Sequence, residues 1–571
     1  MDAGKRTLSD IFNGNRVLEI PFFQRAYVWG ESQWERLVED METVSCSKQP
    51  YFLGSVILKQ QQTSANSDVG DIRTLIDGQQ RLTTLNLFFK VLCLKKNENT
   101  SFERRFMLEN GELALWHNHN DIKSFRRVLN LTELEDIESE DNIIRAYRYF
   151  KENIDISKID RQAILNNLMF VGIDLAVEED EQQIFDTINS LGVRLTTAEL
   201  LKNYFFDRTE IQQYKEYWLE IFEQDDESKT YWDREITTGR LSRTFIDLFF
   251  YSFLQIKIQE TDLGINTADK NEFSKVEALF ESYKRLISKY NLNKSELLSE
   301  IKEYAILFRE NFNYEVIQNE LANEFGIERI NAIIFGLETS TLIPYVLFIL
   351  RNVQDEEQRN ELFKFIETYI LRRMVVRATT KNYNQLFTDR LISKRITSKQ
   401  QFIEFIEDSS EKVNYLPNNQ DLKDGFNNSK LINKQAAGIL YLIESRIRDR
   451  NRQSTQLLGI GKYSLEHLMP KKWKNNWETL DNEDDIYKRN KKLLTLGNLA
   501  IITQSLNASI RDSSWKIKKQ GNNSNQGLTH FSAGIETLAP YLLLQEWNED
   551  EIKNRANFLY EKALEIWEVN D

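Results

Sequence analysis

A long run of helical periodicity limits the folds open to this sequence more than any other feature. From about residue 140, apolar side chains recur at three- and four-residue spacing for nearly 300 residues, which is the pattern of amphipathic helices. In Glu361–Val376, for example, Phe363, Ile366 and Tyr369 lie on one helical face. The periodicity predicts a predominantly helical chain. Two further segments with this pattern are Ile184–Phe206 and Val276–Phe308.

The composition is that of a globular protein with several domains. The 571 residues suggest three to four domains at ~150 residues each. Because 41% of them are hydrophobic and only 6 are Pro, a disordered or collagen-like chain is excluded. The formal net charge is −14, from 74 Lys and Arg against 88 Asp and Glu. Such an acidic chain does not coat nucleic acid by bulk charge, but a local basic site stays open.

The sequence predicts a soluble, cytoplasmic protein without a membrane partner. Two cysteines, Cys46 and Cys93, are too few for a disulfide framework or a four-thiolate zinc site, and they suit a reducing compartment. The polar N-terminus shows no apolar segment of a secretory signal. The longest apolar run, Ile343–Leu350, is far shorter than the ~20 residues that span a bilayer.

The first ~95 residues have a different pattern, in which short apolar runs alternate with turns. After Asp77-Gly78 the spacing of apolar residues changes to that of a helix, with Leu82, Leu85 and Phe89 on one face. A strand, a tight turn and a helix predict a compact α/β unit. The runs predicted as strands are Val17–Ile20, Tyr51–Leu58 and Ile72–Ile76.

The Asp-Gly turn carries the most specific local sequence of the chain, Asp77-Gly78-Gln79-Gln80-Arg81. Free backbone N–H groups at the following helix N-terminus favour phosphate, and Arg81 offers a fork for phosphate oxygens. Thr83 and Thr84 add hydroxyl groups, and Asp77 is suited to hold Mg²⁺ or to position a water molecule. An ordinary turn with a surface arginine has about equal weight when the motif is read alone.

Two more clusters favour a ligand site. Gln24-Arg25 stands among Phe22, Tyr27 and Trp29, a mixture suited to stacking on a base and binding phosphate. The alternative is that the aromatic residues belong to the core and Arg25 is salt-bridged. In the second cluster, Thr196 or Thr197 is an N-cap with Glu199 placed for a capping box. Candidates for polar ligand contact there are Asn189, Gly192 and Lys202.

In this order, the three clusters resemble the N-terminal domain of the GmrSD-type, modification-dependent (type IV) restriction endonucleases, whose relatives include BrxU and SspE. The resemblance covers roughly residues 10–205. It implies a ParB- and sulfiredoxin-like domain that binds and hydrolyses a nucleoside triphosphate, GTP or ATP. The nucleotide-binding residues predicted are Asp77, Gly78, Gln79, Gln80, Arg81, Thr83, Thr84, Gln24, Arg25, Asn189 and Lys202.

Only four histidines are present, and one of them suits catalysis. His117 and His119 lie in a polar turn and are expected at the surface. His467 lies in the short apolar run Leu465–Met469, which Pro470 closes, and an imidazole titrates near neutrality, as a general base requires. A lone histidine in an apolar strand is, however, more often a core residue.

Oxygen-bearing side chains accompany His467. Asn498 is suited to orient the imidazole through its amide oxygen, and Glu466 and Asn507 are ligands suited to a hard ion such as Mg²⁺. Hydrolysis of a phosphodiester needs such a base and a metal that neutralises the phosphate.

This segment resembles the HNH (ββα-metal) nuclease domain that closes the GmrSD-type proteins. The matching residues, in order, are Glu466, His467, Pro470, Gly497, Asn498, Leu499 and Asn507. The resemblance implies catalysis by His467, Asn498, Asn507 and Glu466 with Mg²⁺ or Mn²⁺. One departure is that the final HNH position is Asn507, a weaker metal ligand than His. The closing helix, with Trp547, Ile552, Arg555 and Trp567, also resembles the end of the family.

The charge of this region favours a DNA site. Between Gly461 and His530 there are 12 Lys and Arg against 7 Asp and Glu, so the segment is basic in an acidic chain. Lysines interleaved with tryptophans suit phosphate contacts, whereas a solvated helix face is the plainer alternative. The predicted DNA-binding residues are Lys516, Lys518 and Lys519.

Together these observations predict an α+β, predominantly helical protein in three parts. They are a nucleotide domain (1–210), a helical connecting or sensor region (211–430) and an HNH nuclease domain (431–571), and the polar, Asn-rich stretch Pro417–Lys430 is the best linker candidate. The predicted function is a nucleotide-dependent endonuclease of bacterial anti-phage defence. The resemblance implies that its substrate is modified double-stranded phage DNA, for example with glucosylated hydroxymethylcytosine.

Two alternatives stay open. One resembles the phosphorothioate-sensing SspE proteins, an NTPase and nicking nuclease in which the Gln24-Arg25 stretch would lie beside a sensing pocket. The other is a nucleotide-switched binding or toxin component that needs a partner. The sequence leaves both a homodimer and an accessory defence protein open as partners.

Overall fold

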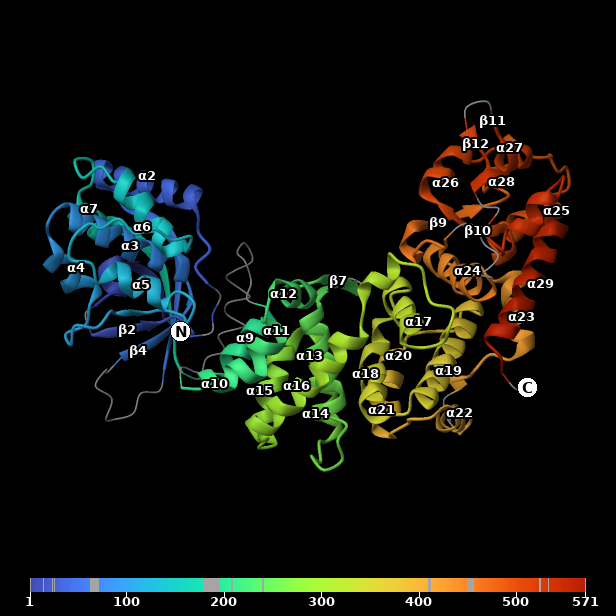
Figure 1. Cartoon of the computed structure of the whole chain (residues 1–571), viewed down its shortest axis with the longest axis horizontal. Coiled ribbons are helices and arrows are strands. Elements are labelled where there is room, and N and C mark those ends of the chain that lie inside the picture. The colour runs from blue at the N-terminus through green and yellow to red at the C-terminus, as the bar shows by residue number, and fades with distance from the viewer. Residues whose placement is uncertain are drawn as a thin grey trace. The chain divides into compact units, whose positions relative to one another are not determined.

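The computed structural model describes residues 2–13, 15–22, 24, 26–61, 71–177, 196–206, 209–238, 241–408, 412–448, 456–522, 525–531 and 534–569. The chain divides into two compact units, Met1–Trp218 and Leu219–Asp571, and the colours of Figure 1 follow the chain through them. The α+β, predominantly helical fold predicted from the sequence is confirmed. None of the described helices is long and apolar enough to cross a membrane.

A mixed six-stranded sheet forms the frame of the first unit. Its strand order is β1-β6-β3-β4-β2-β5. β3 runs parallel to β6 and antiparallel to β4, and β2 is parallel to both β4 and β5. The three predicted strands are confirmed as β2, β3 and β4. The strand bounds are β1 (Asp2–Thr7), β2 (Arg16–Glu19), β3 (Tyr51–Gln60), β4 (Asp71–Asp77), β5 (Leu115–Trp116) and β6 (Leu168–Leu175).

The helix predicted after Asp77-Gly78 is α3, the centre of the core of this unit. Every residue from Leu82 to Leu94 is buried, and α3 lies among α4, α5 and α6 (Figure 1). A helix that is buried all round fixes its first turn against the sheet. The helices described in this unit are α1 (Leu8–Ile11), α2 (Glu31–Ser47), α3 (Gln79–Lys95), α4 (Asn99–Phe106), α5 (Ile122–Leu129), α6 (Asn142–Asn153), α7 (Arg161–Asn167), α9 (Thr197–Phe205) and α10 (Ile211–Tyr214).

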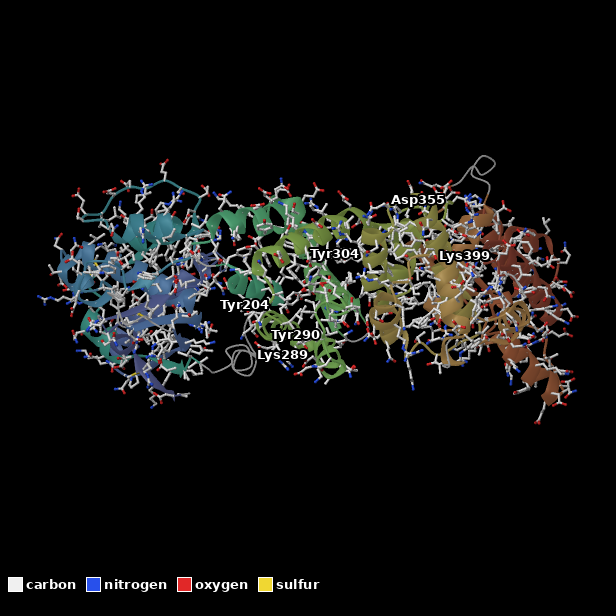
Figure 2. The ribbon with its side chains drawn as sticks, turned by 90° about the horizontal axis from the view of Figure 1, so that it is seen from below. Tyr204, Lys289, Tyr290, Tyr304, Asp355 and Lys399 are labelled. Carbon is white, nitrogen blue, oxygen red and sulfur yellow. The ribbon has the colours of Figure 1, made fainter. Side chains whose placement is uncertain are left out.

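The second unit begins with packed helices around α13, which is buried along nearly its whole length. Polar contacts fasten the outer helices. Lys289 Nζ and Tyr290 Oη, both labelled in Figure 2, lie 2.6 and 2.5 Å from the carboxylate of Asp269. The elements are α11 (Glu220–Phe222), α12 (Asp226–Trp232), β7 (Glu235–Thr238), β8 (Leu241–Thr244), α13 (Phe245–Lys257), α14 (Thr267–Phe273), α15 (Leu279–Lys289), α16 (Lys294–Asn311), α17 (Ile327–Asn331), α18 (Ile343–Asn352), α19 (Glu356–Val375), α20 (Tyr383–Gln385), α21 (Leu391–Ser393), α22 (Lys399–Glu407) and α23 (Asn419–Asn428).

The C-terminal part of this unit surrounds a two-stranded antiparallel sheet, β9–β10. Helix α24 contacts both strands, and α26 follows directly after β10. The elements are α24 (Asn433–Ile447), β9 (Tyr463–His467), α25 (Glu483–Lys492), β10 (Leu499–Thr503), α26 (Gln504–Ile510), α27 (Trp515–Gln520), β11 (Gly521–Asn522), β12 (Asn525–Gln526), α28 (Leu528–Phe531) and α29 (Glu549–Ile566).

The prediction that Pro417–Lys430 is a linker is wrong, because most of it forms α23. Asn418 caps the helix and Asp421 completes a capping box. Leu422 and Phe426, one turn apart, are fully buried. Gly425 lets α23 approach α19, since a Cβ atom there would lie 2.7 Å from Val375 Cγ1. Caps and two buried side chains therefore outweigh the polar composition.

Buried arginines on the middle helices bind the end of the chain. Arg329 is fully buried and donates to both carboxylate oxygens of Glu367 at 2.8 and 2.6 Å. Trp567 Nε1 donates to the same carboxylate at 3.0 Å. Arg372 Nε in turn donates to the carbonyl oxygen of Trp567 at 2.8 Å. The helical middle and the C-terminal part consequently share one polar core.

Candidate functional site

The Asp-Gly turn of the first unit has the geometry of an anion site. Asp77 ends β4, and Gly78 begins α3 with a φ of 100°. A Cβ atom on Gly78 would lie 3.0 Å from Val56 Cγ2, so both the backbone angle and the close packing require glycine. The N-cap residue, Gly78, makes no side-chain cap, and the N–H groups of a first turn without such a cap attract a negative charge.

Arg81 lies back across this turn. Its Nη2 atom donates to Asp77 Oδ2 at 2.9 Å and to the carbonyl oxygen of Ser55 at 2.7 Å. Ser55 Oγ donates to the same Asp77 oxygen at 2.6 Å. Arg81 Nε is buried without a hydrogen-bond partner. The guanidinium is thus held in place while it keeps a donor for a ligand.

The glutamines of the predicted site have different surroundings. Gln79 is buried and its Oε1 atom has no partner, whereas Gln80 Oε1 accepts a hydrogen bond from Val28 N at 2.9 Å. Gln24 is 2% exposed and its Oε1 atom accepts from Asn203 Nδ2 at 2.8 Å. The structure therefore brings the Gln24-Arg25 cluster into contact with the cluster that includes Thr196, Lys202 and Asn203.

Asn203 is a residue that sequence reasoning did not select. Its Oδ1 atom is buried and has no partner, while its amide nitrogen binds Gln24. Lys202, beside it, is buried. Both lie on α9, which Thr196 caps with Glu199 as predicted. The signal for Asn203 was its place directly after Lys202 in the cluster. Three residues that the sequence predicted for ligand contact, Arg25, Asn189 and Gly192, lie outside the described residues.

Thr83 and Thr84 are fully buried in α3 and bind protein groups. Thr83 Oγ1 lies 2.9 Å from His117 Nε2, and Thr84 Oγ1 lies 2.7 Å from the hydroxyl oxygen of Tyr27. These threonines therefore support the helix from inside, and the structure gives neither hydroxyl a place at the turn. Tyr27 is buried in the core, as the plainer interpretation of the aromatic cluster expected.

The prediction that His117 lies at the surface is wrong. Its side chain is 3% exposed, and burial lowers its pKa to about 3. The polar neighbours in the sequence concealed this, because Asn118 and Asp121 are buried as well. His119 is half-buried, with its Nδ1 atom 2.9 Å from the carbonyl oxygen of Phe22.

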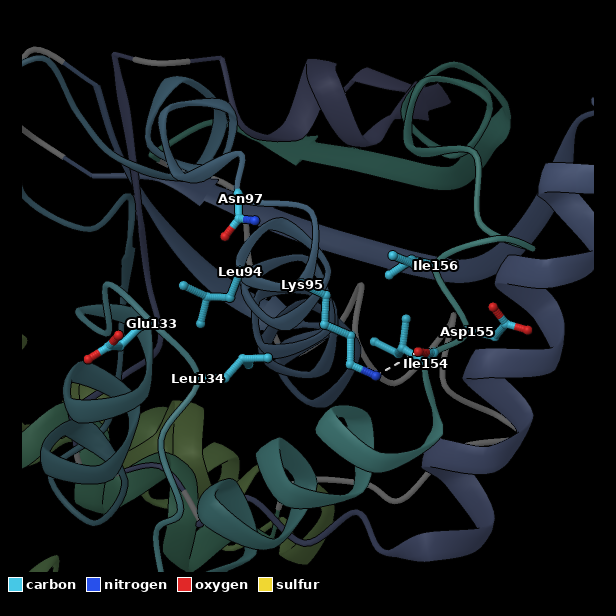
Figure 3. A pocket seen from close by; sticks show the side chains of 8 residues that line it. All are labelled: Leu94, Lys95, Asn97, Glu133, Leu134, Ile154, Asp155 and Ile156. Carbon is cyan, nitrogen blue, oxygen red and sulfur yellow. Dashed lines mark hydrogen bonds between the residues drawn. The ribbon is translucent and has the colours of Figure 1, made fainter.

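A cavity of about 470 Å³ opens elsewhere in the first unit, between the end of α3 and the loops around Glu133 and Asp155 (Figure 3). Its central cation, Lys95, donates to the carbonyl oxygen of Ile154 at 2.7 Å. None of the predicted nucleotide-binding residues lines it. The Asp-Gly turn at the opposite end of α3 stays the better ligand site, because Gln79 Oε1 and Arg81 Nε there are buried without a hydrogen-bond partner.

At the other end of the chain, β9 and β10 pair as antiparallel strands, α25 lies between them in the sequence, and α26 follows β10. His467 is the last residue of β9 and pairs with Leu499 of β10. Its side chain is partly exposed, and burial together with the positive charges of Lys471 and Lys518 lowers its pKa to about 4. The imidazole is therefore neutral at pH 7 and has a lone pair that can take a proton.

Asn498 has a structural place beside this histidine. It is fully buried, and its Oδ1 atom accepts from Met469 N at 2.8 Å and from Trp547 Nε1 at 3.0 Å. Its Nδ2 atom donates to the carbonyl oxygens of Met469 and Leu493. The amide thus fixes the loop after His467, and we find it bound to that loop instead of to the imidazole.

Glu466 and Asn507, the two predicted metal ligands, both contact protein groups in this structure. The carboxylate of Glu466 is buried and ion-paired with Lys518, and Asn507 Nδ2 donates to Ser464 Oγ at 3.0 Å and to the carbonyl oxygen of Leu465. Among the residues that the structure describes, no group of three or more His, Cys, Asp or Glu could hold a metal ion.

The three lysines predicted to bind DNA differ in exposure. Lys516 is exposed, whereas Lys518 is 0% and Lys519 7% exposed. Lys519 Nζ donates to the carbonyl oxygen of Leu544 at 2.7 Å. Only Lys516 of the three therefore presents its ammonium group to solvent. Other exposed lysines of the segment, absent from the predicted set, are Lys471, Lys472 and Lys474.

Contacts with the closing helix α29 explain why glycine is required at Gly497 in the sequence Gly497-Asn498-Leu499. Arg555 is fully buried, and its Nη1 atom donates to the carbonyl oxygens of Gly497 and Leu499 at 2.9 and 2.6 Å. Gly497 lies against the helix backbone, because a Cβ atom there would be 2.0 Å from the carbonyl oxygen of Ile552. The helix thereby fixes the start of β10, opposite His467.

Comparison with known protein families matches both ends of the chain. Residues 8–206 match the model of the GmrSD restriction endonuclease N-terminal domain. Residues 416–562 match the model of the GmrSD restriction endonucleases C-terminal domain. No curated protein matches the chain. The two matches include the Asp-Gly turn and the β9–β10 hairpin, and they imply DNA as the substrate of an endonuclease. The chain therefore belongs to the GmrSD restriction endonuclease family.

Proposed function

We propose that this protein is a nucleotide-dependent endonuclease of bacterial anti-phage defence that cuts modified phage DNA, such as DNA with glucosylated hydroxymethylcytosine. The observation that carries the proposal is the neutral, partly exposed His467 at the end of a β-hairpin, within the matched C-terminal domain. The antiparallel pair β9–β10, with α26 directly after β10, supports an HNH-type nuclease.

In the proposed reaction His467 acts as the general base. Its unprotonated ring nitrogen takes a proton from a water molecule, and the resulting hydroxide attacks the phosphorus atom while the bond to the leaving deoxyribose oxygen breaks. The leaving oxygen takes up a proton from solvent, and the imidazolium returns its proton to solvent. Asn498 fixes the loop after His467, and this loop keeps the imidazole at the end of β9. The resemblance predicts Mg²⁺ or Mn²⁺ as the metal. In this structure Glu466 is paired with Lys518, and Asn507 Nδ2 binds Ser464 Oγ.

The first unit is proposed as a ParB- and sulfiredoxin-like domain that binds and hydrolyses GTP or ATP. The uncapped first turn of α3 would receive a phosphate group, and Arg81, with one donor free, would contact its oxygens. The unpartnered oxygens of Gln79 and Asn203 would bind other polar groups of the nucleotide. Hydrolysis there would license cleavage by the nuclease domain.

Cleavage assays on the full chain test this proposal. The substrates are unmodified, glucosylated and phosphorothioated DNA, each with GTP, ATP or no nucleotide, and with Mg²⁺ or Mn²⁺. We expect cleavage of glucosylated DNA with nucleotide, and a His467→Ala chain that still binds DNA without cutting it. Cutting by His467→Ala would overturn the nuclease assignment, and cleavage confined to phosphorothioated DNA would favour the SspE-like alternative.

The nucleotide site has its own test. Asp77→Ala removes the carboxylate that holds Arg81 and Ser55, and we expect loss of nucleotide hydrolysis with the fold intact. Asp71→Ala, at the other end of the same strand, is the matched control because Asp71 pairs with Arg16 and Arg73 away from the turn. Normal hydrolysis by Asp77→Ala would place the site elsewhere.

A further inference from the structure

A buried lysine lies beneath the end of the strand that carries the candidate base. Lys518 of α27 has no exposed surface, and Glu466 is 5% exposed. The ammonium group of Lys518 forms an ion pair with the carboxylate of Glu466. It also donates to the backbone carbonyl oxygen of His467 at 2.7 Å. One side chain thus contacts both the residue before the base and the backbone of the base itself.

The backbone after His467 is fixed by Asn498. Leu468 N donates to the carbonyl oxygen of Asn498 at 2.9 Å. Met469 N donates to the Oδ1 atom of Asn498 at 2.8 Å, and the carbonyl oxygen of Met469 accepts from its Nδ2 atom at 2.8 Å. Together with Lys518, these bonds hold three consecutive backbone units. Such support fixes the imidazole to within the tolerance that proton transfer needs.

The helix that carries Lys518 is itself firmly placed. The rings of Trp515 and Trp547 stack with centroids 5.3 Å apart. Trp515 Nε1 donates to the carbonyl oxygen of Leu544 at 3.2 Å. Gly527 closes against the end of α27, since a Cβ atom there would be 2.6 Å from the carbonyl oxygen of Lys518. Lys518 therefore reaches Glu466 from a fixed backbone.

We propose that Lys518 is a positioning residue for His467, and that Glu466 is the counter-ion that allows its ammonium group to be buried. A buried cation requires such a partner. A lysine without exposed surface cannot reach a DNA phosphate, and a carboxylate already paired with an ammonium group is a poor ligand for a divalent cation. The proposal rests on the proposed role of His467 as base, and it replaces the predicted DNA and metal roles of these two residues.

Lys518→Met in the full chain is the first test, with Lys516→Ala as the matched control on the same helix. We expect Lys518→Met to cut DNA 10- to 100-fold more slowly in a single turnover at saturating DNA, the usual size of such supporting effects. The slope of log Kd for DNA against log salt should stay as in the wild type. Lys516→Ala, which removes an exposed ammonium group of the same helix, should reduce that slope by about 0.9.

A double variant separates positioning from simple stabilisation. Glu466→Gln with Lys518→Met removes both buried charges, so its thermal midpoint should recover most of what Lys518→Met alone loses. Its cleavage rate should stay low, because the carbonyl oxygen of His467 still lacks its donor. Recovery of the rate together with the midpoint would show a merely structural pair and overturn the proposal.

Metal binding provides a readout that does not depend on cleavage. Mn²⁺ titrated into Glu466→Gln by calorimetry should bind as it does to the wild type, and a tenfold weaker affinity would overturn the proposal. So would a reduced salt slope in Lys518→Met. If His467→Ala cuts like the wild type, the proposed function itself fails. An inactive His467→Ala beside a fully active Lys518→Met overturns the present inference alone.

Discussion

At the scale of single residues, the buried His117 predicts an acid-sensitive first unit. Its pKa is about 3 in the folded chain and 6.5 as a free group. Below pH 6.5 the unfolded chain therefore takes up a proton that the folded chain does not. Stability is lost as the pH falls from 6.5 toward 3, by at most about 1.4 kcal/mol per pH unit. The measurement is the thermal midpoint of the first unit in the full chain between pH 7 and 5.5.

His117→Gln should flatten that pH dependence, because glutamine does not titrate. The control is His119→Gln, which changes a half-buried histidine two residues away and should keep the wild-type dependence. Equal pH slopes in the wild type and in His117→Gln would show that another group is responsible.

The candidate base predicts an unusual pH profile for cleavage. Because the pKa of His467 is lowered to about 4, its imidazole keeps its lone pair well below neutrality. The acid limb of kcat/KM, which reports the free enzyme, should fall below pH 5.5 instead of near 6.5. Lys471→Gln removes one of the positive charges that lower this pKa and should move the limb to higher pH. An acid limb near 6.5 in both chains would contradict the prediction.

The sequence was sufficient to find His467 but not its support. This candidate base stands in a recognisable local pattern, an apolar run closed by Pro470. Lys518 is 51 residues from His467, and its exposure depends on how α27 packs, which no local pattern encodes. For the same reason three lysines of one basic segment were treated alike, although the fold buries Lys518 and Lys519 and exposes Lys516.

At the scale of elements, the contact between β10 and α29 predicts a glycine that tolerates no side chain. In Gly497→Ala the new Cβ would lie 2.0 Å from the carbonyl oxygen of Ile552, so the helix and the strand must separate. We expect a loss of at least 1–3 kcal/mol in the unfolding free energy of the second unit, read from chemical denaturation. Gly4→Ala, whose Cβ would meet only the flexible end of Arg6, should change stability by less than ~0.5 kcal/mol.

Elements were predicted well where periodicity was strong and poorly where composition was the only guide. The strands β2, β3 and β4 and the helix α3 follow from alternation and from the change of period at Gly78. Helix α23 was missed because Asn and Gly residues suggested a linker. Its cap at Asn418 and its apolar pair, Leu422 and Phe426, are nevertheless present in the sequence. These helix signals outweigh the Asn and Gly content that is typical of loops.

At the scale of the whole molecule, the net charge of −14 is unevenly distributed along the chain. The exposed lysines near His467 provide a local positive surface, and an acidic remainder opposes binding to DNA in general. The helical middle, to which the sequence assigned no chemistry, binds the C-terminal part: Arg329 donates to the carbonyl oxygen of Leu442 and Arg372 to that of Trp567. Since these contacts join residues more than 30 positions apart, the sequence could not reveal them.

That shared core predicts how the molecule unfolds. The helical middle and the C-terminal part should melt in one transition, separate from that of the first unit. Glu367→Gln removes the negative charge that pairs with the buried Arg329 and accepts from Trp567. Leaving a buried charge uncompensated lowers the free energy of unfolding by about 3–5 kcal/mol. The midpoint of the second unit should then fall by roughly 5–10 °C, and calorimetry should show the first unit unchanged.

Glu361→Gln is the matched control for this prediction. It makes the same substitution on the same helix, but Glu361 is exposed and pairs with Lys399 at 3.4 Å on the surface, where Figure 2 labels that lysine. Such a pair contributes at most ~1 kcal/mol, so the midpoint should move little. Hydrogen exchange locates the effect: in Glu367→Gln the amides of β9 and β10 should lose protection together with those of α19. If α19 alone loses protection, the C-terminal part folds independently of the helical middle. The buried arginines would then only bind the folded C-terminal part to the helical middle.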